Sequence, residues 1–329
     1  MNAQRILVTG AAGFIGSSVA DALLEHGHEV FGFDNFDPYY DPSQKHRNIQ
    51  RALASSRYRF NEGDVRSAED LRNAFDAARP DAVIHLAARA GVRASVMDPL
   101  TYAEVNEIGG LRVLMECHAR NDIPVVYAST SSVYGKSTRL PFREDDDAST
   151  PLSPYAASKR ASELMAFSFH EIHRLPVAIL RFFTVYGPRG RPDMAFFKFT
   201  SALLADSPIR LHGESTERDF TYIDDIVAGV TGALDWVLRT RSFDTFNLGR
   251  SEPIVVRRVI ELLGKELDRA PHIVLGALEL GEAHRTAANV SHARLTLGYE
   301  PRIGIEEGVS RWVHWLRHSA EAPPLLRSV

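Results

Sequence analysis

Short apolar runs of strand length alternate along the chain with stretches of helical periodicity. The first run precedes a helix that extends to about residue 26, and a second strand follows at once, as in a parallel sheet. These runs are too continuously apolar for a sheet with one face in water, so we expect helices on both faces. The pattern predicts an α/β fold with a doubly wound parallel sheet. The predicted strands include residues 5–9, 29–33, 82–86, 125–129, 177–181 and 245–248.

The alternation becomes less regular after about residue 184, where proline and glycine interrupt mixed strand and helix patterns. We therefore predict a large domain at residues 1–184, completed by a return segment at about 219–250. A smaller C-terminal α/β lobe would occupy residues 185–329. No internal repeat, low-complexity tract or linker interrupts this order.

Composition is that of an ordinary globular protein. The chain has 329 residues, is 44% hydrophobic and carries a net charge of −4. Its basic residues are scattered, so we expect neither a nucleic acid nor a membrane as partner. Apolar runs fall short of the roughly 18 residues of a membrane-spanning helix, and the first strand begins too early for a signal peptide. The one cysteine, Cys117, lies in an apolar pattern and cannot form an internal disulfide, which favours a cytoplasmic location.

A glycine-rich turn joins the first predicted strand to the first helix. It reads Gly10-Ala-Ala-Gly13-Phe-Ile-Gly16. Glycines permit a tight bend and let backbone N–H groups approach a pyrophosphate at the helix N-terminus. The spacing differs from the GxGxxG fingerprint, and a tight turn without a ligand is the alternative. We predict a dinucleotide site formed by Gly10, Gly13, Phe14, Ile15 and Gly16.

Acidic residues at the ends of later strands extend this predicted site. Asp34 closes the second strand, where a carboxylate binds the ribose hydroxyls of NAD and repels the 2′-phosphate of NADP. Asn35 follows it rather than Arg or Lys, so we predict NAD as the cofactor, with Asp34 and Asn35 as contacts. Asp64, followed by Val65, comes after a third strand and is placed to meet the adenine. Asp64 could instead cap the helix that begins near residue 67.

The run Ser153-Pro-Tyr-Ala-Ala-Ser-Lys159 combines a helix start with an acid–base pair. Serine followed by proline is typical of an N-cap and first helical position, which puts Tyr155 and Lys159 one turn apart on one face. The ammonium should lower the pKa of the phenol from about 10 toward neutrality, where a general base works best. An exposed helix start with a chance YxxxK spacing is the alternative. Together with the dinucleotide turn, the pair predicts a redox site.

Six segments together resemble the extended short-chain dehydrogenase/reductase family of nucleotide-sugar enzymes, and the likeness is strongest to UDP-glucuronate 4-epimerases. They occupy residues 34–41, 85–93, 129–135, 181–188, 190–194 and 218–225. The resemblance covers nearly the whole chain. It implies an NAD-binding Rossmann domain at 1–184 and a UDP-sugar-binding lobe at 185–329. Leu86, Ala87 and Ala88, in the second segment, are predicted to contact the cofactor.

The resemblance also assigns roles in catalysis and binding. Tyr155 would be the base, and Lys159 would lower its pKa and bind the nicotinamide ribose. Thr130 would be the hydroxyl that hydrogen-bonds the reacting sugar oxygen. Arg218 would pair with the UDP diphosphate, for which a planar guanidinium is suited, and Arg93 would lie near the mouth of the substrate cleft.

Two positions after the threonine distinguish the subfamilies. Resembling dehydratases carry Asp-Glu there and decarboxylases carry Ser-Glu, whereas this chain has Ser131 and Ser132. Neither serine is an acid or base, so elimination is disfavoured, and small hydroxyls there can hydrogen-bond a carboxylate. Thr184 and Arg191 lie in a run that looks like the uronate enzymes and would hold the C6 carboxylate or a phosphate. A polar strand end and a surface loop charge are the alternatives for the serines and Arg191.

We therefore expect reversible C4 epimerisation of UDP-glucuronate to UDP-galacturonate with enzyme-bound NAD and without a metal. The enzyme alternatives are a 4-epimerase of a neutral UDP-hexose or UDP-N-acetylhexosamine and a UDP-glucuronate decarboxylase. A non-catalytic nucleotide-sugar sensor is the alternative from another class.

Two further expectations concern the nucleobase and the assembly. The segment Leu280-Gly-Glu-Ala-His-Arg285 departs from the family's Pro-Gly-Asp-Val-Pro run, which leaves the UDP-ribose contacts and the nucleobase open. In the family, helices that correspond to residues 100–119 and 154–174 form a dimer's four-helix interface. We therefore expect a homodimer.

Overall fold

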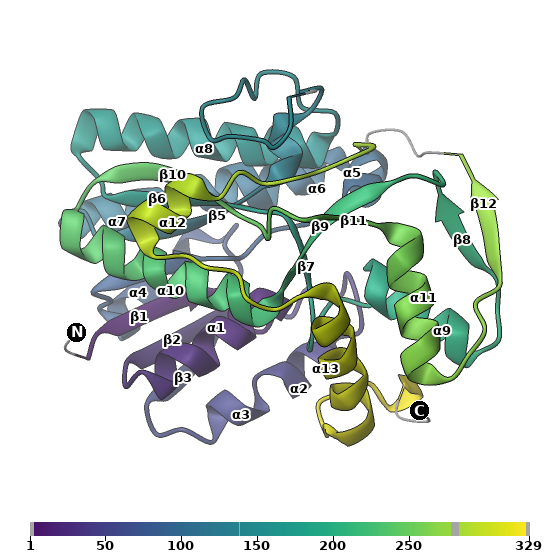
Figure 1. Cartoon of the computed structure of the whole chain (residues 1–329). Coiled ribbons are helices and arrows are strands. Elements are labelled where there is room, and N and C mark those ends of the chain that lie inside the picture. The colour runs from purple at the N-terminus through teal and green to yellow at the C-terminus, as the bar shows by residue number, and fades with distance from the viewer. Residues whose placement is uncertain (1–2, 138, 278–282, 327–329) are drawn as a thin grey trace.

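Parallel strands form a seven-stranded central sheet in the computed structural model, which describes residues 3–137, 139–277 and 283–326 (Figure 1). From β1 the chain builds the sheet outward, first to β2 and β3 on one side and then to β4, β5, β6 and β10 on the other. The predicted doubly wound fold is therefore confirmed. In sheet order the strands are β10 (Phe243–Leu248), β6 (Val177–Phe182), β5 (Val125–Thr130), β4 (Ala82–His85), β1 (Arg5–Thr9), β2 (Glu29–Asp34) and β3 (Tyr58–Glu62).

Helices cover both faces of this sheet. Ile6 and Val8 of β1 belong to one hydrophobic cluster and Leu7 to the other, because successive side chains of a strand point to opposite faces. The first cluster is closed by α1 (Phe14–Glu25) and α10 (Ile223–Thr240), which pack against each other. The second cluster is closed by α4 (Ala68–Ala78), the π-helix η1 (Ala103–Gly109), α7 (Gly110–Ala119) and α8 (Pro154–His173).

The smaller lobe contains two short sheets, visible on the right of Figure 1. One has the order β11 (Pro253–Val255), β9 (Glu217–Tyr222), β7 (Thr184–Tyr186), and the other pairs β12 (Ile273–Gly276) with β8 (Ile209–His212). Helices α9 (Ala195–Leu204), α11 (Val256–Leu267) and α13 (Ile305–His318) pack beside them. Helix α12 (Ser291–Leu297) instead packs on α10 and β10 of the large domain. The division at residue 184 stays a prediction.

Short helices occupy the connections. Helices α2 (Pro42–Asn48) and α3 (Gln50–Leu53) follow β2, and α5 (Val92–Met97) and α6 (Pro99–Tyr102) follow β4. The 3-10 helices are η2 (Ser131–Tyr134) and η3 (Pro324–Leu326). Among the described residues, no helix is long and apolar enough to cross a membrane, and no group of three or more His, Cys, Asp or Glu side chains could hold a metal ion.

The start of α8 agrees with its sequence signature. The Ser153 side chain accepts a hydrogen bond from the Ala156 backbone N–H at 3.2 Å, and Pro154 is the first helical residue. The predicted N-cap is confirmed. Tyr155 and Lys159 therefore lie in the first two turns of α8, beside the carboxyl end of β5.

Candidate active site

One cavity of about 290 Å³ opens at the carboxyl ends of the central strands and extends to the lobe. This edge of a doubly wound sheet is where such folds bind ligands. Most residues predicted for the cofactor and substrate line it: Gly10, Gly13, Phe14, Ile15, Gly16, Asp34, Asn35, Asp64, Val65, Leu86, Ala87, Ala88, Thr130, Tyr155, Lys159, Thr184 and Arg191. Four predicted substrate contacts lie outside this lining: Arg93, Ser131, Ser132 and Arg218.

The glycine turn has no room for side chains at its two ends. A methyl group added to Gly10, where φ is +72°, would lie 2.6 Å from the backbone N of Ala87. One added to Gly16 would lie 2.1 Å from the carbonyl oxygen of Gly10. Gly13 lines the cavity and is the N-cap of α1, whose first N–H groups have no acceptor within the helix. The turn therefore fits the pyrophosphate of a dinucleotide.

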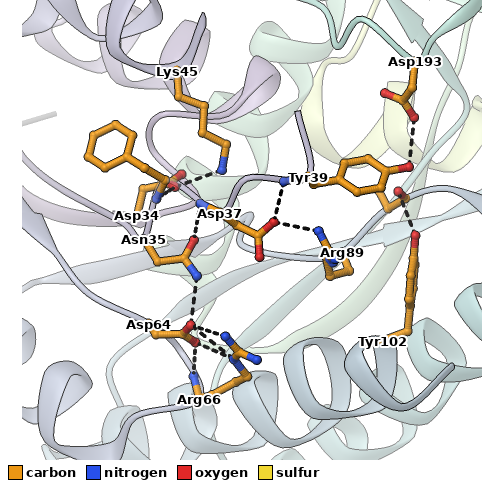
Figure 2. Close-up of polar contacts among 12 residues, drawn as sticks. Asp34, Asn35, Asp37, Tyr39, Lys45, Asp64, Arg66, Arg89, Tyr102 and Asp193 are labelled. Carbon is orange, nitrogen blue, oxygen red and sulfur yellow. Dashed lines mark hydrogen bonds and ion pairs between the residues drawn. The ribbon is translucent and has the colours of Figure 1, made fainter. Parts of the chain in front are cut away.

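Asp34 is buried at the end of β2, and both oxygens of its carboxylate accept hydrogen bonds. It accepts hydrogen bonds from the backbone N–H groups of Ala12 at 3.1 Å and Phe36 at 2.9 Å. Lys45, from α2, lies 3.3 Å from the same carboxylate and also lines the cavity (Figure 2). The pair presents an acceptor and a donor side by side, which suits the two hydroxyls of a ribose. The sequence reasoning missed Lys45, because only the packing of α2 brings it beside Asp34.

Asp64 forms the other end of the predicted cofactor site. Asn35 donates to it at 2.9 Å and the Arg66 side chain at 2.7 Å (Figure 2). Burial opposes ionisation, but the hydrogen bonds from Arg66 and Asn35 outweigh it and lower the pKa of Asp64 to about 2. The alternative that Asp64 caps the next helix is wrong, since Ser67 is the N-cap of α4.

Tyr155, Lys159 and Thr130 all line this cavity. Burial raises the pKa of Tyr155 above its usual 10, while a hydrogen bond with Thr130 and the nearby Arg191 guanidinium oppose that rise. We expected Lys159 to lower this pKa, but the groups that do so are Thr130 and Arg191. Burial lowers the pKa of Lys159 itself from 10.5 to about 8, against a smaller opposite effect of Glu163.

Glu163 lies one turn beyond Lys159 in α8 and is buried at 3% exposure. Its carboxylate accepts hydrogen bonds from Ser129 at 2.5 Å and from two nitrogens of Arg181, each at 2.9 Å. Arg160 contributes a further bond at 2.7 Å. The network ties α8 to β5 and β6, one helical turn from Lys159. The four-residue spacing from Lys159 to Glu163 could have indicated that Glu163 lies on the same face of the helix as Lys159, but the sequence analysis did not use it.

Arg191 enters the cavity from the loop after β7. Asp193 accepts hydrogen bonds from its Nε and Nη2 atoms, each at 2.9 Å. Although burial opposes it, the pairing with Arg191 and a hydrogen bond from Tyr39 hold the pKa of Asp193 below its ordinary value. Thr184, at the start of β7, lines the same part of the cavity.

The predicted residues outside the lining lie at three places. Ser131 and Ser132 begin η2, and the Thr130 hydroxyl donates to the Ser132 hydroxyl at 3.3 Å. Arg93 is exposed on α5. Arg218, on β9, donates to the carbonyl oxygens of Glu217 at 3.0 Å and His284 at 3.3 Å. Residues 280–282 of the segment Leu280–Arg285 lie outside the described residues, so the predicted departure there is described only at 283–285.

The fold and this cavity define a dinucleotide-binding protein that carries a tyrosine and a lysine one helical turn apart in the same cavity. The chain belongs to the NAD dependent epimerase/dehydratase family, whose model matches residues 6–249. It is 42% identical over 327 residues to UDP-glucuronate 4-epimerase 1 of Arabidopsis thaliana, covering 94% of this chain and 76% of that protein.

Solved structures agree with the family. The UDP-glucuronic acid 4-epimerase of Bacillus cereus, in complex with UDP-glucuronic acid and NAD, superposes with a TM-score of 0.86 at 34% identity, over 93% of this chain and 97% of that one. The UDP-glucose 4-epimerase of Thermotoga maritima, with UDP-glucose, gives a TM-score of 0.85 at 30% identity, over 95% of this chain and 98% of that one. The fold alone therefore does not distinguish a uronate from a neutral sugar.

Proposed function

We propose that the protein interconverts UDP-glucuronate and UDP-galacturonate by transient oxidation at C4, with bound NAD. The observation that carries the proposal is the meeting of Thr130, Tyr155 and Lys159 in the same cavity as the glycine turn. The identity of 34% to the Bacillus cereus UDP-glucuronic acid 4-epimerase, against 30% to the Thermotoga maritima UDP-glucose enzyme, supports a uronate substrate.

In the proposed reaction, Tyr155 removes the proton of the C4 hydroxyl and later returns it. Thr130 lines the same cavity as Tyr155 and would hold the same sugar oxygen. Lys159 would bind the nicotinamide ribose from the floor of the cavity. NAD supplies the acceptor and donor of hydride at C4. The 4-keto sugar must turn within the site before its other face is reduced, so the reaction leaves the cofactor unchanged overall.

The cofactor contacts form the second part of the proposal. The turn from Gly10 to Gly16 would hold the pyrophosphate, with Leu86, Ala87 and Ala88 lining the cavity beside it. Asp34 and Lys45 would bind the adenosine ribose. Asn35, Asp64 and Val65 would lie along the adenine.

The substrate carboxylate needs to be held, because a 4-keto uronate is a β-keto acid that can lose carbon dioxide. We propose that hydroxyls hold it so that the C–C bond to the carboxylate does not align with the carbonyl π system. Thr130 and Thr184 line the cavity, and Ser132 contacts Thr130. The proposed set is Thr130, Ser131, Ser132 and Thr184, with Arg191 on the carboxylate or phosphate and with Arg93 and Arg218 farther out, Arg218 toward the diphosphate.

A second candidate is a 4-epimerase of a neutral UDP-hexose. It is favoured by the pairing of Arg191 with Asp193 at two 2.9 Å contacts, since a uronate carboxylate would have to share this guanidinium with Asp193. A decarboxylase is less well supported, because Ser132 stands where the resembling decarboxylases carry an acid.

Product analysis tests the proposal. The purified protein is incubated with UDP-glucuronate, and separately with UDP-glucose, and the UDP-sugars are separated. We expect UDP-galacturonate, little UDP-pentose and slower conversion of UDP-glucose. With UDP-glucuronate deuterated at C4, the product should keep its deuterium without exchange from solvent. Conversion of UDP-glucose alone would instead establish the second candidate, and Tyr155→Phe serves as the inactive control.

We also propose a homodimer formed by η1, α7 and α8, in the cytoplasm. Apolar side chains stand exposed on these helices, such as Ile108 at 46%, Met115 at 54%, Phe167 at 47% and Ile172 at 70%. Two such helices from each copy would make a four-helix interface. Cys117 is buried and free, as suits a reducing compartment. Sedimentation should give a dimer mass that Phe167→Glu reduces to that of the monomer.

A further inference from the structure

The loop from Asp34 to Asp41 contains a run of local side-chain to backbone hydrogen bonds. Three side chains among its first four residues each accept a hydrogen bond from the backbone N–H two residues later, at 2.9 Å. These are Asp34 to Phe36, Asn35 to Asp37, and Asp37 to Tyr39 (Figure 2). Such Asx turns fix the backbone locally. The run of turns thus extends from Asp34, beside the proposed ribose site, to Tyr39.

Tyr39 joins this loop to the lobe. Its hydroxyl donates to Asp193 Oδ2 at 3.2 Å, as Figure 2 shows, and the same oxygen accepts from Arg191 Nη2. Two guanidinium groups lie near the ring, that of Arg89 at 4.8 Å and that of Arg191 at 5.9 Å from its centroid. Arg89 in turn donates to Asp37 of the loop at 2.6 Å. Two Arg–Asp pairs, one from each side of the cavity, thus meet at one phenol.

We propose that Tyr39 and Asp193 are positioning residues that couple cofactor binding to binding of the substrate's anionic group. Asp193 fixes two nitrogens of Arg191 and leaves Nη1 for a carboxylate or phosphate. Tyr39 fixes Asp193 relative to the loop that holds Asp34. A cofactor that orders the loop therefore orders Arg191, and an anion on Arg191 holds the loop closed over the cofactor, because coupling between two binding sites is reciprocal. This inference rests on the proposed function.

The coupling has a use in the proposed reaction. The reduced cofactor must not leave while the 4-keto sugar turns, and a substrate anion that retains the cofactor prevents that loss. The Tyr39–Asp193 hydrogen bond sets the expected strength of this retention of the cofactor. A hydrogen bond to a charged group changes an equilibrium by roughly tenfold or more.

The experiment measures how fast the NAD-loaded protein releases NAD on dilution, with and without saturating UDP-glucuronate. We expect UDP-glucuronate to slow release from the wild type. In Tyr39→Phe, which keeps the ring, this slowing should shrink by about tenfold. In Asp193→Asn, which changes the partner of Tyr39 in the lobe, we expect the slowing of NAD release to shrink in the same way. The double variant should lose no more than Asp193→Asn alone, because the Tyr39 hydroxyl acts on Arg191 only through Asp193.

A matched control is the exposed pair Arg143–Asp145, which has the same two-residue spacing and the same 2.9 Å contact from Nε to Oδ1. In Asp145→Asn, UDP-glucuronate should slow the release of NAD as much as it does in the wild type. Full wild-type slowing in both Tyr39→Phe and Asp193→Asn, in a protein that epimerises UDP-glucuronate, overturns the coupling alone. A wild type that does not turn over UDP-glucuronate refutes the proposed function and this inference with it.

Discussion

Lys159→Met should abolish catalysis and yet stabilise the folded protein at neutral pH. Burial lowers the pKa of Lys159 from 10.5 to about 8 in the folded state. At pH 7 the lysine is protonated in both the folded and the unfolded state, so the whole cost of burying its charge opposes folding. At 1.36 kcal/mol for each pKa unit, this cost is about 3 kcal/mol. Methionine has a similar length and no charge, so we expect it to remove most of that cost.

The pH dependence follows from the same shift. Because the pKa is depressed on folding, the wild type gains stability as pH rises from about 8 toward 10.5, where the folded protein releases the proton first. Lys159→Met lacks this gain, so the difference in stability between the variant and the wild type should shrink between about pH 8 and pH 10.5.

Urea unfolding measured between pH 6 and pH 10, after removal of bound NAD, tests this because cofactor binding then contributes nothing. Lys198→Met, at an exposed position of α9, is the control and should change stability by no more than about 0.5 kcal/mol. The inferred cost of burying the Lys159 charge would be refuted if Lys159→Met were less stable than the wild type at pH 7. It would also be refuted if the difference in stability between the two proteins did not vary with pH.

Three further predictions concern the cavity. Tyr155→Phe should keep its bound NAD and lower turnover by about 100-fold or more, measured as product formation and as NAD content of the denatured protein; near-normal turnover would exclude Tyr155 as the base. Gly16→Ala should lose NAD, since its methyl group would lie 2.1 Å from the Gly10 oxygen, whereas Gly304→Ala, whose methyl group would meet nothing closer than 3.9 Å, should retain it. Thr184→Val should raise the share of UDP-pentose among the products by roughly tenfold as well as slow epimerisation. An unchanged ratio would mean that Thr184 does not hold the carboxylate.

Sequence determined the features that depend on neighbours along the chain. The strand and helix order, the glycine turn and the Ser153 N-cap of α8 were all predictable, because each is set by local periodicity or by backbone geometry within a few residues. The placement of Asp34, Thr130 and Tyr155 at one cavity also followed, since the carboxyl ends of parallel strands share one edge of the sheet.

Tertiary structure decided what depends on residues distant in sequence. Lys45 reaches Asp34 through the packing of α2, and Tyr39 reaches Asp193 across the cavity from a loop 154 residues away. Arg93 and Arg218 have suitable chemistry, but their backbones place them outside the cavity lining. The pKa of Tyr155 also departs from the expectation based on Lys159, because burial raises it and the opposing charge comes from Arg191 in the lobe. Helical spacing specifies which residues share a face, whereas desolvation and charge at a site depend on every element that encloses it.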